Sequence, residues 1–298
     1  MYASASRSER EEGGGAPGGD GPAGDPLAAI RARARLALRA HVAEGRTRRA
    51  VVREEGALRL RFPGEDRARL DAVAVNVAGG MAGGDSYEVE IVAEPGAQVV
   101  FTTAAAEKVY RALGAPTRAD MRLEAQAGAQ LCILPQETIL YDGARLRRRV
   151  EIDLNEQARF VLCDLVVFGR AAMGEDVRTL DWADHWRLRR GGALVWADSA
   201  RVCGDAMARL AAKATGNGAR AAGLLLYAAP DAADHLDALR ESFSAQGPDA
   251  PACEAGASCF EGLLLARFLA PDAFGARKAM ERALRLLPGG APPRSWST

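Results

Sequence analysis

Four short blocks of this 298-residue chain hold the residue types that could do chemistry. Each block follows an apolar stretch and mixes glycines or hydroxyl residues with charged side chains. The blocks cover residues 79–85, 102–111, 134–145 and 169–175. Their carboxylates suit acid–base work or loose cation binding, and their glycines leave backbone N–H groups open to an anion.

The first block, Gly79–Asp85, concentrates four glycines in six residues: Gly79, Gly80, Gly83 and Gly84. Without Cβ atoms, the backbone there can approach another backbone or a ligand closely. The block is not a phosphate-binding P-loop, because no Gly-Lys-Ser/Thr follows, and not a dinucleotide fingerprint, because strand signals follow it. A sharp turn between two strands is the alternative interpretation.

The carboxylates of the later blocks are Glu137, Asp142 and Glu175. A pair of them could do acid–base work or bind a cation transiently. In the alternative interpretation, Glu137 pairs with a nearby arginine, Asp142 and the next residue form a hairpin turn, and Glu175 lies in a turn. In the second block, Thr102 could cap a helical turn, with a strand-end loop as the alternative.

Metal cages and nucleophilic triads are not visible in the sequence. The chain has only His41, His185 and His235, with no HxH or HExxH spacing, and Cys253 and Cys259 lack a second pair. No preformed zinc or nickel site follows from such residues. The absence of GxSxG argues against a serine triad. His185, within Trp182–Trp186, is expected to pack between aromatic side chains.

Strand patterns extend from Leu36 to about Phe168 and are expected to position these blocks. Alternating apolar residues or short apolar runs occur at 58–62, 70–77, 87–91, 99–101 and 131–134. Alternation with period 2 is typical of strands that bury one face, and short apolar runs are typical of strands covered on both sides.

A repeat underlies the strands. Three segments share a polar pair, a turn, an alanine and an apolar run: 94–101, 126–133 and 156–162. Their alanines, Ala97, Ala129 and Ala158, are 32 and 29 residues apart. Such a period indicates stacked supersecondary units that share one core. The sequence therefore predicts a mainly β, β-helical or solenoid-like layered architecture, with a β-sandwich as the alternative.

A few short helices are expected near the C-terminus. Asp231 can cap one with Leu236, Leu239 and Phe243 on one face, and Asp272 can cap another that ends at Pro288. Residues 204–215 fit either helix or loop, and residues 246–258 are expected to form a loop.

Composition places limits on the class of protein. Lys+Arg and Asp+Glu are equal at 39 each, so no general attraction to nucleic acid or an anionic membrane is expected. The five scattered cysteines indicate reduced thiols, and neither a membrane span nor a signal peptide is recognisable, so the expected location is the cytoplasm. Residues 1–30, rich in Gly, Ala and Pro, are predicted to be a flexible tail, and residues 31–298 a single domain.

The order and the residue identities of the four blocks resemble those of the UreD family of urease accessory proteins, also called UreH. The glycine block resembles the family's GGxxGGD motif and includes Asp85. The other matching positions are Thr102, Thr103, Lys108, Tyr110, Arg111, Pro135, Gln136, Glu137, Gly143, Arg145, Gly169, Arg170 and Gly174. The ending, residues 293–298, is also similar to the family. The segment 63–67 is more polar than the aromatic and proline-rich stretch of many members, and Met81-Ala82 replaces bulkier aliphatic residues.

The resemblance implies a β-helical, non-catalytic accessory protein that acts in the loading of nickel into apo-urease. It implies binding to UreF, through it to the GTPase UreG, and to the urease subunits. It also implies an internal tunnel as a proposed nickel route, with no tightly bound cofactor. Asp85, Asp142 and Glu175 lie at motif positions and are candidate ligands for nickel in transit, because oxygen ligands release a divalent ion more readily than imidazole or thiolate.

Two other functions remain open from the sequence. One is a carbohydrate-active enzyme on a β-solenoid that uses the carboxylates of the later blocks, which would have to lie about 5–10 Å apart in a groove. The other is a nickel store with its own tight site, against which the scarcity of His and paired Cys argues.

Overall fold

The computed structural model describes residues 31–64, 68–244 and 252–296. The flexible tail predicted for residues 1–30 lies outside this range. All seventeen described strands belong to two sheets, which enclose a common apolar core between them. The side chains that fill this core include Leu36, Ile91, Phe101 and Phe160.

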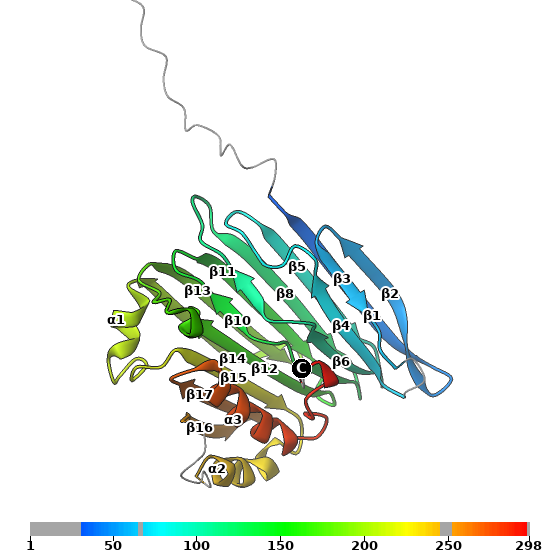
Figure 1. Cartoon of the computed structure of the whole chain (residues 1–298). Coiled ribbons are helices and arrows are strands. Elements are labelled where there is room, and N and C mark those ends of the chain that lie inside the picture. The colour runs from blue at the N-terminus through cyan, green and yellow to red at the C-terminus, as the bar shows by residue number, and fades with distance from the viewer. Residues whose placement is uncertain (1–30, 65–67, 245–251, 297–298) are drawn as a thin grey trace, which may run out of the picture. The chain divides into compact units, whose positions relative to one another are not determined.

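The first sheet has seven strands in the order β14-β13-β11-β8-β5-β1-β2. Their bounds are β1 Arg33–Ala43, β2 Arg46–Glu55, β5 Ser86–Ala93, β8 Thr117–Ala125, β11 Arg145–Leu154, β13 Leu180–Arg190 and β14 Ala193–Gly204. Strands β5, β8, β11 and β13 pair in parallel without a change of register and lie side by side in Figure 1.

The second sheet runs β16-β17-β15-β12-β9-β6-β4-β3, with β7 and β10 paired beside β12. The bounds are β3 Leu58–Arg61, β4 Leu70–Asn76, β6 Gln98–Thr103, β7 Glu107–Val109, β9 Gln130–Ile133, β10 Thr138–Leu140, β12 Arg159–Phe168, β15 Ala221–Ala228, β16 Glu254–Phe260 and β17 Leu263–Ala270. The central strands β4, β6, β9 and β12 are parallel.

Along the chain, the parallel strands belong alternately to the second and to the first sheet. Each turn of chain therefore adds one strand to each sheet. The result is a β-solenoid of about four turns, which confirms the predicted mainly β, solenoid-like architecture. The repeated alanines mark the corners between the sheets. Ala97, Ala129 and Ala158 are buried, and each donates its N–H to the carbonyl three residues earlier at 3.0 Å. Small buried residues there let successive turns stack closely.

The helices come late in the chain, as predicted. They are α1 Ala206–Ala211, α2 Leu236–Ser244 and α3 Ala273–Arg285, with short 3-10 turns at Ala171–Met173, Ala232–His235 and Arg294–Trp296. Asp272 caps α3 through Gly275 N–H at 2.7 Å. Asp231, by contrast, makes no cap, because its carboxylate binds Arg159 and Tyr227. Among the described residues, no helix has the length and apolarity needed to cross a membrane.

Several local predictions were wrong. Strands continue well beyond Phe168, and residues 254–258 belong to β16 where a loop was expected. Thr102 lies next to the end of β6 and caps no helix, which is closer to the alternative interpretation of a strand end. His185 does not pack between aromatic rings, because strand alternation turns Trp182 and Trp186 inward and His185 outward, where its ring meets Ser199.

Candidate functional site

The four sequence blocks lie on one side of the solenoid, where the chain passes from the second sheet to the first. Successive loops are joined by backbone hydrogen bonds: Met81 N–H to Lys108 O at 2.7 Å, Ala112 N–H to Gly143 O at 3.0 Å, and Gly143 N–H to Thr179 O at 2.7 Å. Because the turns of chain stack in register, these loops stack too. We call the surface formed by residues 79–85, 109–114, 141–145 and 169–175 the motif ridge.

The glycine block forms the first loop of the motif ridge and connects β4 to β5. A Cβ on Gly80 would lie 2.5 Å from the Tyr110 ring, and one on Gly83 would lie 2.4 Å from Ala112 Cβ. One on Gly84 would meet the Arg31 side chain at 2.8 Å. The glycines therefore allow the first two loops to pack against each other, and the structure supports the interpretation of a tight turn between strands.

Aromatic and guanidinium groups link the loops of the motif ridge. The Tyr110 hydroxyl donates to Gly79 O at 2.8 Å, and its ring packs edge-on against Tyr141 with centroids 5.2 Å apart. The Arg170 guanidinium lies 4.2 Å from the centroid of the Tyr141 ring. Arg111 reaches Asp142 at 3.2 Å, and Arg145 donates to Gly114 O at 2.6 Å. These contacts hold the second, third and fourth loops in a fixed order.

Asp142 and Glu175 are brought together on neighbouring loops. Glu175 accepts the Asp142 N–H at 3.3 Å and pairs with Arg170 at 2.9 Å, while Asp142 accepts the N–H groups of Arg178 and Thr179 at 2.9 and 2.8 Å. Desolvation raises the pKa of the Asp142 carboxyl, but these backbone hydrogen bonds and Arg111 together lower it below its usual value. The hydrogen bond from Arg170 lowers the pKa of Glu175.

Asp85 has a different setting at the end of the glycine block. Its side chain is buried, at 6% exposure, and accepts the N–H groups of Ala32 at 2.9 Å and Ala82 at 2.8 Å. It thereby holds the start of β1 to the glycine turn. Among the residues that the structure describes, no group of three or more His, Cys, Asp and Glu side chains could hold a metal ion. Nickel transit past Asp85, Asp142 and Glu175 stays a prediction.

The third block also anchors the C-terminal segment. Glu137 pairs with Arg277 of α3 at 2.8 Å, as the alternative interpretation of this residue predicted. Gln136 donates to Ser295 O at 3.0 Å, and Trp296 donates its indole N–H to Leu134 O at 3.1 Å.

Arg277 completes this cluster, because its guanidinium lies 4.8 Å from the Trp296 ring centroid. The N–H of Gln136 also binds the Thr103 hydroxyl at 2.9 Å, and the Thr102 hydroxyl lies 3.4 Å from that of Ser295. Gln136 and Glu137 thus serve the docking of α3 and of the C-terminal segment, and Pro135 lines a small pocket together with Arg277 and Trp296.

The remaining block positions shape the backbone. Lys108 takes part through its carbonyl, which accepts the Met81 N–H. Gly143, Gly169 and Gly174 have φ of +77°, +78° and +68°, a conformation that favours glycine. A side chain on Gly169 would also lie 2.9 Å from Val177.

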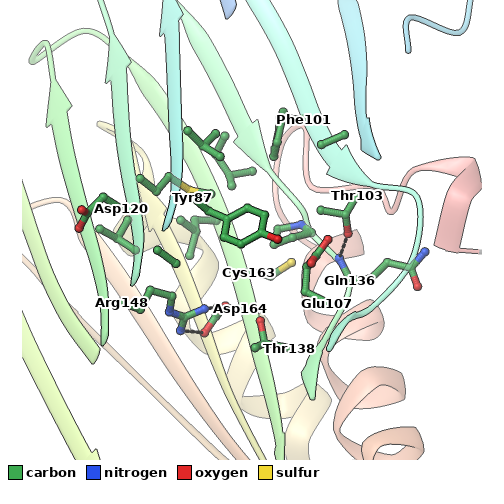
Figure 2. Close-up of a pocket in the computed structure, with 18 of the residues that line it drawn as sticks. Tyr87, Phe101, Thr103, Glu107, Asp120, Gln136, Thr138, Arg148, Cys163 and Asp164 are labelled. Atoms are coloured by element: carbon green, nitrogen blue, oxygen red, sulfur yellow. Dashed lines mark hydrogen bonds and ion pairs between the residues drawn. The ribbon is translucent and has the colours of Figure 1, made fainter. Parts of the chain in front are cut away.

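A cavity of about 130 Å³ lies inside the solenoid, between the two sheets (Figure 2). Its polar groups include Tyr87, Glu107, Gln136, Arg148 and Asp164. Desolvation raises the pKa of the Glu107 carboxyl, partly offset by the hydrogen bond from Asn76. Desolvation likewise raises the pKa of Tyr87 to about 12.

Arg148 joins the sheets beside this cavity. Its guanidinium pairs with Asp164 of β12 at 2.6 Å and with Asp184 of β13 at 2.5 Å, and each carboxylate receives two hydrogen bonds. Sequence reasoning missed this cluster. A signal was present, because Arg148 shares its strand face with the apolar Leu146 and Val150, which predicts an inward position.

The block residues make up a structural framework. Glu137, Asp142 and Glu175 are each paired with an arginine, so these three carboxylates do not form the free pair that glycoside hydrolysis would use. The fold and site together define a β-solenoid protein whose four sequence blocks build the motif ridge, beside a mainly apolar internal cavity that holds a few polar groups.

Comparison with known proteins identifies this class. Residues 32–297 match the family model described as UreD urease accessory protein. A relative from Bradyrhizobium sp. (strain BTAi1), urease accessory protein UreD 3, is 46% identical over 92% of this chain and 96% of its own. Urease accessory protein UreD of Rhodopseudomonas palustris (strain BisB18) is 45% identical over 91% and 95%. The chain belongs to the UreD family of urease accessory proteins.

Proposed function

We propose that this chain helps to mature urease by acting as a scaffold for loading nickel into the apoenzyme. In this proposal it binds UreF, recruits the GTPase UreG through UreF, and docks on the urease subunits in the cytoplasm. The observation that carries the proposal is the family match along residues 32–297, since the relatives are named urease accessory proteins. Residues 31–298 would act as one domain in this role.

The chain would contribute no catalytic step of its own and no tightly bound cofactor. Support comes from the pairing of Glu137, Asp142 and Glu175 with arginines, which leaves them poorly suited to acid–base work. Nickel is the cargo in this proposal. Asp85, Asp142 and Glu175 would offer it oxygen ligands briefly, exchanging their present hydrogen bonds for the ion, and the internal cavity would provide space along its route.

The scaffold role can be tested by co-expressing the tagged full-length chain with UreF, UreG and the urease subunits. We expect the tagged chain to capture its partners and urease to gain nickel only when the chain is present. Urease that fills with nickel equally well without the chain, under limiting nickel, would refute the scaffold role.

A test of the carboxylates in nickel transit requires substitutions that remove the charge but keep the shape of the side chain. Asp85→Asn and Glu175→Gln are expected to lower the nickel content of co-expressed urease by about tenfold, the usual scale for loss of a group that supports metal handling. Glu90→Gln is a matched control, because Glu90 is exposed on β5 and outside the motif ridge. Normal nickel content in both variants, with thermal stability and partner capture unchanged, would remove these two residues from the route.

A further inference from the structure

A hollow of about 450 Å³ opens on the outer face of the first sheet, outside the motif ridge loops, and shares only Trp186 with the lining of the internal cavity. Strands β11, β13 and β14 form its walls. The lining residues are Arg149, His185, Trp186, Arg187, Ala197, Asp198 and Ser199. None of them belongs to the four blocks that resemble the family.

Strand register explains why donors gather there. Arg149, His185 and Ser199 are direct neighbours across the three strands, and the Ser199 hydroxyl lies 2.8 Å from His185 Nδ1. Arg187 lies two residues further along the same face of β13, opposite the small Ala197. The small side chain leaves space next to a long one, so the face is hollowed at this point.

The hollow carries positive charge that is not neutralised inside the protein. The guanidinium groups of Arg149 and Arg187 are exposed and form no hydrogen bond or ion pair with any other residue that the structure describes. Asp198, the acid in the wall, pairs with Arg267 of β17 at 2.7 Å. Asp120 and Glu151 are the acidic neighbours of Arg149 and Arg187 by register, yet neither comes within the 4.0 Å of an ion pair.

We propose that this hollow is a docking site for an acidic segment of a protein partner in the urease maturation assembly. The proposal rests on the proposed function and adds to it a surface and the chemistry of its occupant. Two guanidinium groups and a hydroxyl on one face can bind several carboxylates at once, and Arg can bind a carboxylate through two parallel hydrogen bonds.

A protein segment suits the hollow better than a single small anion. An ion pair in open solvent contributes little, so a lone carboxylate or phosphate on exposed arginines would be held weakly. A partner that covers the hollow would exclude water from both arginines and strengthen each pair. The site is therefore complete only under a protein surface.

The test compares two double variants of the tagged full-length chain, co-expressed with the urease subunits, UreF and UreG. Arg149→Glu with Arg187→Glu reverses the charge of the hollow. Arg118→Glu with Arg122→Glu changes the net charge equally, on exposed arginines of β8 that do not line the hollow. Thermal unfolding of both variants checks that they fold.

We expect the hollow variant to retain one partner about tenfold less well than the unchanged chain, and the β8 variant to retain it normally. Capture by the unchanged chain should also weaken as salt is raised. Equal retention by both variants, or equal loss, would overturn the assignment. The scaffold role would survive that result as long as the unchanged chain still captures its partners and supports nickel loading.

The chemistry of the occupant can be read directly with a photo-crosslinking amino acid at position 197. Crosslinks to a partner segment rich in Asp and Glu would support the proposal, and exchange of those acids for lysine should restore binding to the hollow variant. Crosslinks to nucleic acid, or to a segment without acidic residues, would contradict it.

Discussion

The guanidinium of Arg148 joins the two sheets from inside the solenoid. It is shared by Asp164 and Asp184, of which Asp184 has a side chain only 4% exposed. Burial disfavours the charged guanidinium, yet the two carboxylates raise the pKa of Arg148 well above its ordinary value. Each member of the cluster thus depends on the others to remain charged in the interior.

Arg148→Met should therefore destabilise the fold strongly, because two carboxylates would stay buried without their partner. We expect a loss of about 3–5 kcal/mol in the free energy of unfolding, measured by urea titration. Arg147→Met is the matched control, since Arg147 on the same strand pairs with Asp181 near the surface and should cost about 1 kcal/mol or less. Equal losses in the two variants would show that burial of the cluster does not decide its contribution.

The first two loops of the motif ridge can pack closely only because glycines without side chains lie between them. The glycine turn and the loop after β7 approach so closely that Gly83 has no room for a methyl group beside Ala112. Gly114 lies in the same loop as Ala112, but no atom comes within 4 Å of the place where its Cβ would lie. Neither glycine has a positive φ, so space alone separates them.

Gly83→Ala should accordingly cost about 1–3 kcal/mol of stability through overpacking. Gly114→Ala should be neutral or stabilise by up to about 1 kcal/mol, because it reduces the freedom of the unfolded chain. Thermal unfolding of both variants measures the difference. If Gly83→Ala unfolds no earlier than Gly114→Ala, the two loops are not packed as tightly as the structure shows.

Across the whole molecule, several carboxylates have a pKa below the usual value. The pKa values of Asp142, Glu175, Asp181 and Asp231 are lowered in the folded protein by hydrogen bonds and arginines, against some desolvation. The unfolded chain then binds more protons than the folded one in acid, so stability falls as pH falls. Glu107, whose pKa is raised, acts in the opposite sense, and its contribution is lost as pH rises through the folded value.

The protein should therefore lose stability as the pH drops below about 4, the ordinary range of Asp and Glu. Urea titrations at a series of pH values give the slope. Replacing Asp142 and Glu175 with Asn and Gln should make that slope shallower, while Glu107→Gln should remove the loss of stability that occurs as the pH rises through the raised pKa of Glu107. A stability that stays level into strong acid would contradict the shared effect.

Much of the architecture could be predicted from local patterns. Alternation along a strand and the spacing of Ala97, Ala129 and Ala158 are properties of neighbouring residues, and they sufficed for the β-solenoid. The α3 helix and its Asp272 cap were visible for the same reason. Strands after Phe168 were missed although signals were present: β13 alternates apolar and polar residues, and β15 is a short apolar run.

The sequence by itself determined the class of fold, the family resemblance and the four blocks, because each depends on residue type and spacing along the chain. Only the tertiary structure decided what the blocks do. It paired Glu137 with Arg277, stacked Asp142 against Glu175, buried Arg148 and turned Arg149 and His185 outward. The residues that pair are between 16 and 140 positions apart in the sequence, and Arg148 and Arg149 lie on opposite faces of one strand. The stacking of the solenoid turns decides which side chains meet.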